Sequence, residues 1–485
     1  MKDANATGYG RRVAGQGLLL FCGHAMGQFC ALARNALLGH LLSKGDFGIA
    51  VTLTLTLQVF EILSDVAADR MIVRAEDGDN PKLVDVGHLM LIARGLVIAT
   101  LLWALAPVAA GYFKVDGAEW AFRWVALIPL VKAFMHLDAR RMQRSLVNRP
   151  IVLIETVPQV IALALTYFMV QWAGDYGVVV WLALLQAVLA VLISHVVAER
   201  GYRIGVDWAI LSRFLAFGWP ILLSAVPLLA VYQGDRVIVA RFFDMEELGG
   251  YSAAFVITMV PISLATKVGL SLGLPILANV QNDRDMFAAR YRTMTELGVA
   301  AAALYLAVFA ILGGHMLPLV FGPNFSGYGT LVATLAVMWS IRMLQVAPGT
   351  ALMACGQTRP HLVAGMLRAT SLGLAVLFAL NGASLAVVAA AGIVGELLSL
   401  VSVAVYMRRI DPALARLLNS RAIFHVGVVA AVCAVYRLLP LDGGVMWAGV
   451  VAMSGCALVV GSAALLFAET RNQFLASLSA QATEA

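Results

Sequence analysis

The chain has 485 residues, of which 61% are hydrophobic and 13% are charged, and its mean hydropathy is +0.86. Because soluble domains carry about 25% charged residues, this composition excludes a soluble enzyme and indicates a polytopic membrane protein. The formal net charge is +6, but the basic residues gather in alternate short loops, so we expect no nucleic-acid partner.

Apolar stretches long enough to cross a hydrocarbon core of about 30 Å recur along the whole chain. Because lipid offers the backbone no hydrogen bonds, each stretch predicts a helix. The sequence predicts fourteen spans, at about 14–41, 48–72, 85–111, 120–140, 151–172, 177–198, 214–241, 249–276, 293–317, 329–354, 361–381, 384–407, 422–439 and 445–468. The loops between the spans are too short to hold a soluble catalytic domain.

The basic residues also predict the orientation of the chain in the membrane. One set of alternate loops is rich in Lys and Arg and includes Arg74, Arg140, Arg141, Arg144, Arg149, Arg200, Arg408 and Arg409, whereas the opposite set holds little beyond Lys44, Lys114, Arg241 and Arg437. By the positive-inside rule, this alternation places both termini in the cytoplasm and favours an even number of spans.

Two stretches of the chain resemble each other and suggest an internal repeat. They are ARNALLGHLLSKGDFGIAVTL at 33–53 and QGDRVIVARFFDMEELGGYSAAF at 233–255, and an offset of 201 residues pairs Gly48 with Gly249. The same offset pairs Arg12 with Arg213 and Gly17 with Gly218. A second echo, Asn148-Arg149-Pro150 and Thr358-Arg359-Pro360, has an offset of 210.

The repeat predicts the domain organisation. Six spans in each half give both halves the same orientation, so an axis along the membrane normal should relate them, with a substrate cleft between them. We expect an N-terminal six-helix lobe at 1–205, a C-terminal six-helix lobe at 206–410, and two additional transmembrane helices with a cytoplasmic tail at 411–485.

Several cations lie within the predicted spans. A charge at mid-bilayer costs about 3 kcal/mol on insertion scales, so such residues should face a cavity or a partner. The candidate substrate-binding residues are Arg34, Arg94, Lys132, Arg236, Lys267, Arg342 and Arg368. Snorkelling towards the interface or structural ion pairing is the alternative for each of them.

Carboxylates in the spans are candidates for gating or ion coupling. Glu61, Asp65 and Asp69 follow an i, i+4, i+8 spacing, which predicts a polar stripe on one face of the second span. Glu396 lies in the twelfth span, and Asp235 is opposite Arg34 in the repeat. A salt bridge between Asp235 and Arg34 would close the outer mouth of the cleft between the halves. For the polar stripe, structural ion pairing is the alternative.

The cysteines and histidines suggest no cofactor. The five cysteines show no CxxC spacing, and His24, His88, His136, His195 and His315 are scattered singly over different spans without an HxxxH pair. Metal sites need several such ligands close together. We therefore expect no metal, no cofactor and no catalytic residues.

Four segments resemble a known family: LLSKGDFGIA, GDRVIVARFFDMEELGGYSAA, FGPNFSGYGTL after the ninth span and ACGQTRP after the tenth. They are similar to the polysaccharide-transport branch, the Wzx-type flippases, of the multidrug, oligosaccharidyl-lipid and polysaccharide exporter (MOP) superfamily. The resemblance implies an all-α fold of about fourteen transmembrane helices, made of two parallel six-helix repeats and two additional C-terminal helices. It also implies that the protein lies in the bacterial inner membrane and that it is a transporter rather than an enzyme.

The implied activity is movement of an undecaprenyl-diphosphate-linked oligosaccharide from the cytoplasmic to the periplasmic leaflet by alternating access. Spread cations suit this cargo, because Arg and Lys bind diphosphate through charge-assisted hydrogen bonds. Membrane lipid and a polysaccharide polymerase are the other expected partners. Two alternatives stay open: a cation-coupled multidrug exporter of the same fold, and a membrane-embedded polysaccharide polymerase or glycosyltransferase.

Overall fold

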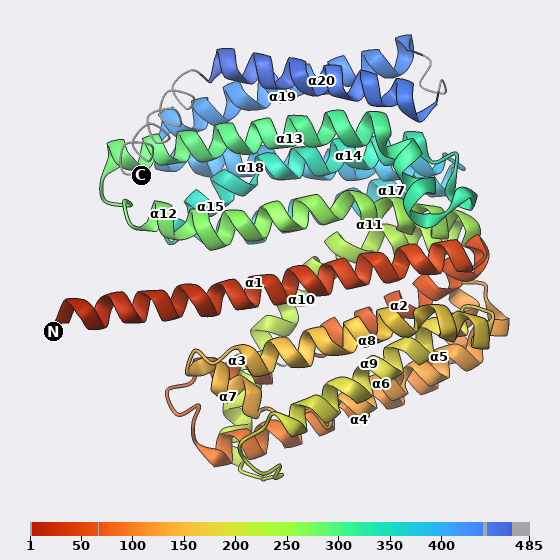
Figure 1. The fold of residues 1–485 in the computed structure, drawn as a ribbon, viewed down its shortest axis with the longest axis vertical. Helices are drawn as coiled ribbons and strands as arrows, with labels where there is room; N and C mark the ends of the chain where they lie inside the picture. Colours follow the sequence, from red (N-terminus) through yellow and green to blue (C-terminus); the bar gives the residue numbers. More distant parts are fainter. Residues whose placement is uncertain (1, 66, 440–443, 468–485) are drawn as a thin grey trace. The chain divides into compact units, whose positions relative to one another are not determined.

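The computed structural model describes residues 2–65, 67–439 and 444–467, and every regular element among them is a helix (Figure 1). The chain divides into two compact units, Met1–Gly250 and Tyr251–Ala485. The predicted all-α fold is thereby confirmed. The predicted lobes, whose boundary is at 205/206, remain a prediction.

In the first unit, short helical segments lie between the long helices. The elements are α1 (Lys2–Leu41), α2 (Lys44–Leu63), α3 (Ala68–Arg74), α4 (Pro81–Tyr112), η1 (Asp116–Ala118), α5 (Glu119–Val125), α6 (Leu127–Lys132), α7 (Asp138–Arg144), α8 (Arg149–Ala173), α9 (Gly177–Val196) and α10 (Trp208–Phe242). Of the short segments, α3 follows α2, and η1, α5, α6 and α7 lie between α4 and α8. Within this unit α1 packs on α8, and α8 packs on α9.

The boundary between the units lies within α11 (Met245–Val268), which continues into the second unit. The later elements are η2 (Gly269–Gly273), α12 (Leu274–Ala278), α13 (Arg284–Phe321), η3 (Pro323–Phe325), α14 (Gly329–Leu344), α15 (Val346–Ala354), α16 (Arg359–Ala369), α17 (Ser371–Leu380), α18 (Leu385–Ile410), α19 (Pro412–Leu438) and α20 (Val445–Leu466). Figure 1 shows α13, α14 and α18 side by side, and α19 and α20 pack on α13.

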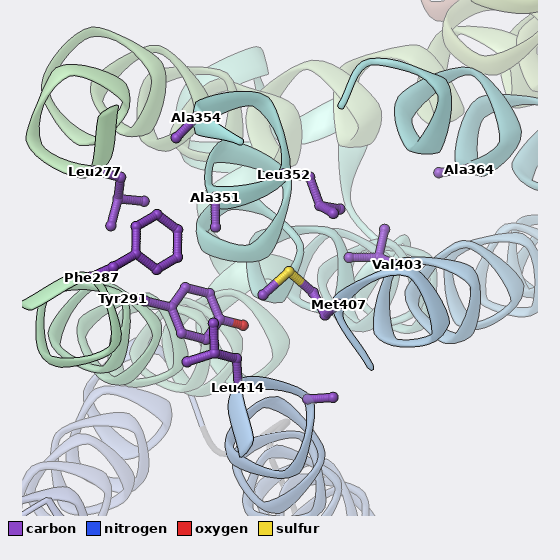
Figure 2. Packing of buried hydrophobic residues seen from close by; sticks show 11 residues of the cluster. Leu277, Phe287, Tyr291, Ala351, Leu352, Ala354, Ala364, Val403, Met407 and Leu414 are labelled. Atoms are coloured by element: carbon purple, nitrogen blue, oxygen red, sulfur yellow. The ribbon is translucent and has the colours of Figure 1, made fainter. Parts of the chain in front are cut away.

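A tightly packed apolar cluster holds the second unit together. Figure 2 shows Phe287 and Tyr291 of α13 packed near Ala351 of α15, Met407 of α18 and Leu414 of α19, all of them buried. Between helices that would otherwise face lipid, close van der Waals packing rather than removal from water stabilises such contacts. Small residues such as Ala351 let the helix backbones approach closely.

Among the described residues, thirteen helices are long and apolar enough to cross a membrane. They coincide with thirteen of the predicted spans. The exception is the predicted span at 120–140, where α5 and α6 have only 7 and 6 residues. The fourth span is therefore a chain of short helical segments rather than one continuous helix.

The predicted polar stripe on one face of the second span is wrong. The helix ends at Leu63 and resumes at Ala68, and Ala67 between them has a left-handed backbone with φ of 52°. A helical face needs continuous helical dihedrals, so Glu61, Asp65 and Asp69 do not share one. A sequence pattern that fits a helix does not exclude a break where side chains can satisfy the backbone.

The paired glycines of the predicted repeat meet each other in the first unit. A Cβ atom added to Gly48 would lie 1.8 Å from the Met245 carbonyl oxygen, and one added to Gly249 would lie 2.7 Å from the Lys44 carbonyl oxygen. Met245 and Lys44 are also 201 residues apart in the sequence. Reciprocal contacts of this kind are what a local two-fold relation produces, while the layout of the whole repeat remains a prediction.

Candidate functional site

Four of the predicted cations lie where a helix ends inside a span. Lys132 is the last residue of α6, and Arg342, Arg368 and Lys267 lie in the last turns of α14, α16 and α11. The π-helical turn Gly269–Gly273 directly follows α11. A helix C-terminus leaves carbonyl groups free and carries partial negative charge, which favours a cation there. Interrupted helices are also where transporters commonly build binding sites.

The first cluster, here called the Glu61 cluster, consists of Glu61, Ser64, Arg94 and Lys132. Lys132 Nζ donates to Glu61 Oε1 at 2.8 Å. Arg94 donates to the Glu61 carbonyl oxygen at 2.8 Å and to Ser64 Oγ at 3.2 Å. These last two acceptors belong to the end of α2 and to its C-cap, so Arg94 satisfies backbone and side-chain oxygens at the helix break.

The Glu61 cluster is accessible and holds more positive than negative charge. The side chains of Lys132 and Glu61 are 41% and 28% exposed. Both hydrogen bonds of Arg94 go to neutral oxygens. The cluster therefore holds two cations and one carboxylate, of which only Lys132 contacts that carboxylate, and the site has electrostatic capacity for an added anion.

The second cluster, here called the Glu396 cluster, consists of Arg342, Gln345, Arg368, Glu396 and Ser399. Glu396 Oε1 lies 3.2 Å from Arg342 Nε and 2.7 Å from Arg368 Nε. Gln345 donates to Glu396 Oε2 at 3.0 Å and accepts from Ser399 Oγ at 2.7 Å. Arg342 lies on α14, Gln345 directly follows that helix, Arg368 lies on α16, and Glu396 and Ser399 lie on α18. The network therefore joins three spans.

The Glu396 cluster is almost closed to solvent. The side chains of Arg342, Arg368 and Glu396 are 11%, 19% and 3% exposed. A carboxylate buried to this degree needs charged and hydrogen-bonding partners, because the protein interior does not replace its hydration. Two guanidinium groups and an amide supply them, again with one more cation than carboxylate.

Sequence reasoning missed Gln345, Ser399 and Ser64, because neutral polar residues in apolar helices give no distinctive spacing. It also missed that the offset of 210 residues pairs Lys132 with Arg342. Lys132 is the last residue of α6, and Arg342 lies in the last turn of α14, so each lies at the end of a helical segment of the predicted fourth span in its half. The same offset was already visible in Asn148-Arg149-Pro150 and Thr358-Arg359-Pro360, so it could have identified this pair.

The other two acids of the predicted stripe make ion pairs around the helix break. Asp65 accepts from Arg70 at 2.8 Å and from the Ala67 backbone N–H at 2.9 Å. Asp69 lies 3.7 Å from Arg140. The structure thus gives both residues the structural pairing that was the alternative reading, and leaves Glu61 as the acid in contact with a cation of the candidate site.

The remaining predicted residues are Arg34, Asp235, Arg236 and Lys267. Asp235 accepts a hydrogen bond from the Arg236 backbone N–H at 2.8 Å, and Arg236 donates to the Tyr232 carbonyl oxygen at 3.0 Å. Arg34 on α1 is partly buried, whereas Lys267 on α11 is exposed. A salt bridge from Arg34 to Asp235 remains a prediction.

The histidines that looked scattered in the sequence meet in part. The ring centroids of His88 and His136 are 5.0 Å apart, and those of His136 and His195 are 5.3 Å apart. Among the residues that the structure describes, no group of His, Cys, Asp and Glu has the arrangement of a metal site. The ring nitrogens instead bond to the backbone.

Solved membrane proteins share this fold. An inward-facing multidrug resistance MATE family transporter of the MOP superfamily matches with a TM-score of 0.67 at 14% identity, over 80% of this chain and 96% of that one. The lipid II flippase MurJ, in an inward closed conformation, matches with a TM-score of 0.70 at 11% identity, over 94% and 99%. The chain therefore has the fold of these transporters, and its candidate spans make it a multi-pass membrane protein.

The chain belongs to the polysaccharide biosynthesis protein family, whose model matches residues 37–329. It is 22% identical to the teichuronic acid biosynthesis protein TuaB of Bacillus subtilis, over 67% of this chain and 68% of that protein. It is 18% identical to the lipopolysaccharide biosynthesis protein WzxC of Escherichia coli, over 67% and 66%. The family match confirms the predicted resemblance. The chain also shares its fold with solved transporters, which agrees with the prediction that it is not an enzyme.

Proposed function

We propose that this chain is a flippase that moves undecaprenyl-diphosphate-linked oligosaccharide repeat units from the cytoplasmic to the periplasmic leaflet of a bacterial inner membrane, by alternating access. Both termini would lie in the cytoplasm, as the distribution of Lys and Arg favours. Family membership supports a role in polysaccharide production, and the fold supports transport across the membrane.

The observation that carries the proposal is the surplus of cations at the helix breaks. The Glu61 cluster holds two cations and one carboxylate: Lys132, which is 41% exposed, contacts the carboxylate, and Arg94 contacts the Glu61 carbonyl oxygen. A diphosphate is the part of the cargo that pays the largest desolvation cost inside a membrane. Charge-assisted hydrogen bonds from an ammonium and a guanidinium group would offset that cost.

Glu61 would keep this contact weak enough for release. Its carboxylate contacts the Lys132 ammonium group at 2.8 Å. An arriving diphosphate would compete with Glu61 for the same ammonium group, so binding gains only the difference between the two contacts. Exchange of one anionic partner for another is suited to a carrier, which has to release its cargo on the other side.

The test is a flipping assay in proteoliposomes with labelled undecaprenyl-diphosphate oligosaccharide. The variants are Lys132→Gln, Arg94→Gln and their combination, and Arg123→Gln is the control because it removes a cation of the same unit that pairs with Glu119 outside the cluster. One charge-assisted hydrogen bond contributes about 1.5–3 kcal/mol. The flipping rate should therefore fall about tenfold to a hundredfold for each single variant and stay near wild type in the control.

Two results would overturn the proposal. One is wild-type flipping in the combined variant. The other is transport of cationic drugs, with no movement of the lipid-linked sugar, by the wild-type protein under an ion gradient. That second result would favour the multidrug exporter and would assign Glu61 to coupling.

A further inference from the structure

The break after Lys132 leaves four backbone groups without helical partners. Side chains of neighbouring helices satisfy three of them, and the side chain of His136 within the break satisfies the fourth. His195 bonds to the Phe134 carbonyl oxygen at 3.0 Å. The backbone N–H groups of residues 136, 137 and 138 donate to Ser194 Oγ at 3.0 Å, His88 Nε2 at 3.1 Å and His136 Nδ1 at 3.1 Å. Buried backbone groups require such partners, so these side chains are what makes the break stable.

The second ring nitrogens of two of these histidines bond to residues 197–207, here called the connecting segment, which joins α9 to α10. His88 Nδ1 lies 2.7 Å from the Arg203 carbonyl oxygen, and His136 Nε2 lies 2.9 Å from the Arg200 carbonyl oxygen. Each ring therefore bridges the helix break and the connecting segment. Tyr202 of that segment stacks on the His88 ring, with centroids 4.2 Å apart.

These bonds require both imidazoles to be neutral. A carbonyl oxygen only accepts, and a backbone N–H only donates, so each ring must donate from one nitrogen and accept at the other. His88 must carry its proton on Nδ1, and His136 must carry its proton on Nε2. A protonated ring donates from both nitrogens, and would direct an N–H at the N–H of Leu137 or Asp138.

The charged groups around the two rings are largely paired with one another. Asp138 accepts from Arg141 and from the backbone N–H groups of Glu199 and Arg200. Arg141 also donates to Glu199, and Arg200 donates to the Asp79 carbonyl oxygen. The titratable and charged groups facing the rings are Asp85 on α4, Asp138 and Arg141 on α7, His195 on α9, and Glu199, Arg200, Tyr202 and Arg203 on the connecting segment.

We propose that His88 and His136 form a proton-sensitive latch, which holds the connecting segment on the helix break next to Lys132 while both rings are neutral and releases it when either ring takes up a proton. Proton uptake converts the accepting ring nitrogen into an N–H donor. This N–H then points at the backbone N–H of Leu137 (for His88) or Asp138 (for His136), so that hydrogen bond is lost. The latch regulates the fourth span from its cytoplasmic end. It would operate whatever cargo the protein carries.

The test is amide hydrogen exchange on the full-length protein in lipid nanodiscs, followed from pH 8 to pH 5, the range in which histidine changes charge. After correction for the intrinsic pH dependence of exchange, the amides of residues 134–138 and 197–205 should exchange about tenfold faster at the acidic end, because local opening exposes them. A flat corrected profile in the wild-type protein overturns the proposal without any variant.

Two substitutions connect the effect to these rings. In the combined variant His88→Gln, His136→Gln the acid-induced step should disappear, because an amide cannot take up a proton in this range. His24→Gln is the control, because His24 is exposed on α1 of the same unit, and it should keep the step. A step that persists in the combined variant, or that disappears in the control, contradicts the latch.

An independent readout is the tautomer of each ring. Nitrogen NMR of histidine-labelled protein at pH 8 should show the Nδ1–H tautomer for His88 and the Nε2–H tautomer for His136. Assignment comes from loss of one signal in each single Gln variant. The opposite tautomer at either position would break the bridge to the connecting segment and overturn the proposal.

Discussion

The two units build the same kind of charge cluster in different surroundings. In the first unit, Lys132 and Arg94 surround Glu61, and the paired side chains are 41% and 28% exposed. In the second unit, Arg342 and Arg368 surround Glu396, whose side chain is only 3% exposed. Each cluster has two cations and one carboxylate. The exposed fraction of the carboxylate side chain, however, differs by about an order of magnitude between Glu61 and Glu396.

Exposure decides what each cluster can do. Partners of a buried carboxylate are needed for stability, because removing one leaves an uncompensated charge. A partly exposed pair contributes little to stability, since water and counter-ions take over either partner. The Glu61 cluster is therefore better suited to exchange partners with a cargo, and the Glu396 cluster is better suited to fix α14, α16 and α18.

The largest expected effect is from Glu396→Gln. The two buried guanidinium groups would lose their shared contact with the Glu396 carboxylate. Breaking a buried ion pair costs about 3–5 kcal/mol, so the thermal unfolding midpoint in detergent should fall strongly. Glu61→Gln is the matched control and should lose less than about 1 kcal/mol. Equal losses in the two variants would break the comparison between the clusters.

A combined replacement sharpens the same comparison. Replacing a buried ion cluster by apolar residues is often neutral or stabilising by about 1–4 kcal/mol. Arg342→Met, Arg368→Met, Glu396→Leu should therefore recover most of the stability lost in Glu396→Gln. If the triple variant is stable but no longer flips the lipid-linked sugar, the buried cluster contacts cargo, and the division of roles proposed above is wrong.

Exchanging the charges of Glu61 and Lys132 distinguishes the contribution of their ion pair to stability from the role of Lys132 in binding cargo. The double variant Glu61→Lys, Lys132→Glu keeps both charges and should unfold within about 1 kcal/mol of wild type. It moves the ammonium group from the end of α6 to α2, so flipping should still fall about tenfold or more. Recovery of wild-type flipping would mean that only the net charge of the cluster matters.

A surface pair gives the smallest effect and calibrates the others. Asp77 accepts two hydrogen bonds from Arg213, and this guanidinium group holds the pKa of the carboxyl below its ordinary value. The pair stabilises the fold above the ordinary Asp value of about 3.9, and this contribution is lost as pH falls through the lower, folded-state pKa.

The side chains of Arg213 and Asp77 are 46% and 38% exposed, so Asp77→Asn should cost less than about 1 kcal/mol at neutral pH. Thermal unfolding between pH 7 and pH 3 should show the difference between variant and wild type shrinking towards acid. A larger loss at pH 7 would show that exposure underestimates the stabilisation by such pairs, and would weaken the argument for the Glu61 cluster as well.

Much of the fold could be predicted from hydropathy alone, because a helix that faces lipid must be apolar along its whole length. The repeat offset likewise identified Gly48 and Gly249, whose contact with the opposite backbone permits no side chain. The failures occurred at helix breaks. The residues that stabilise the break after Lys132 come from α4 and α9, and no local pattern near residue 132 indicates them.

The sequence by itself determined the membrane class, the positions of thirteen spans and the identity of the intramembrane charges, because these follow from the cost of placing polar groups in lipid. Only the tertiary structure decided which charges pair, how deeply each pair is buried and which histidines meet. Those properties depend on side chains from helices that are far apart in the sequence, and burial and distance set the strength of an ionic contact far more than residue type does.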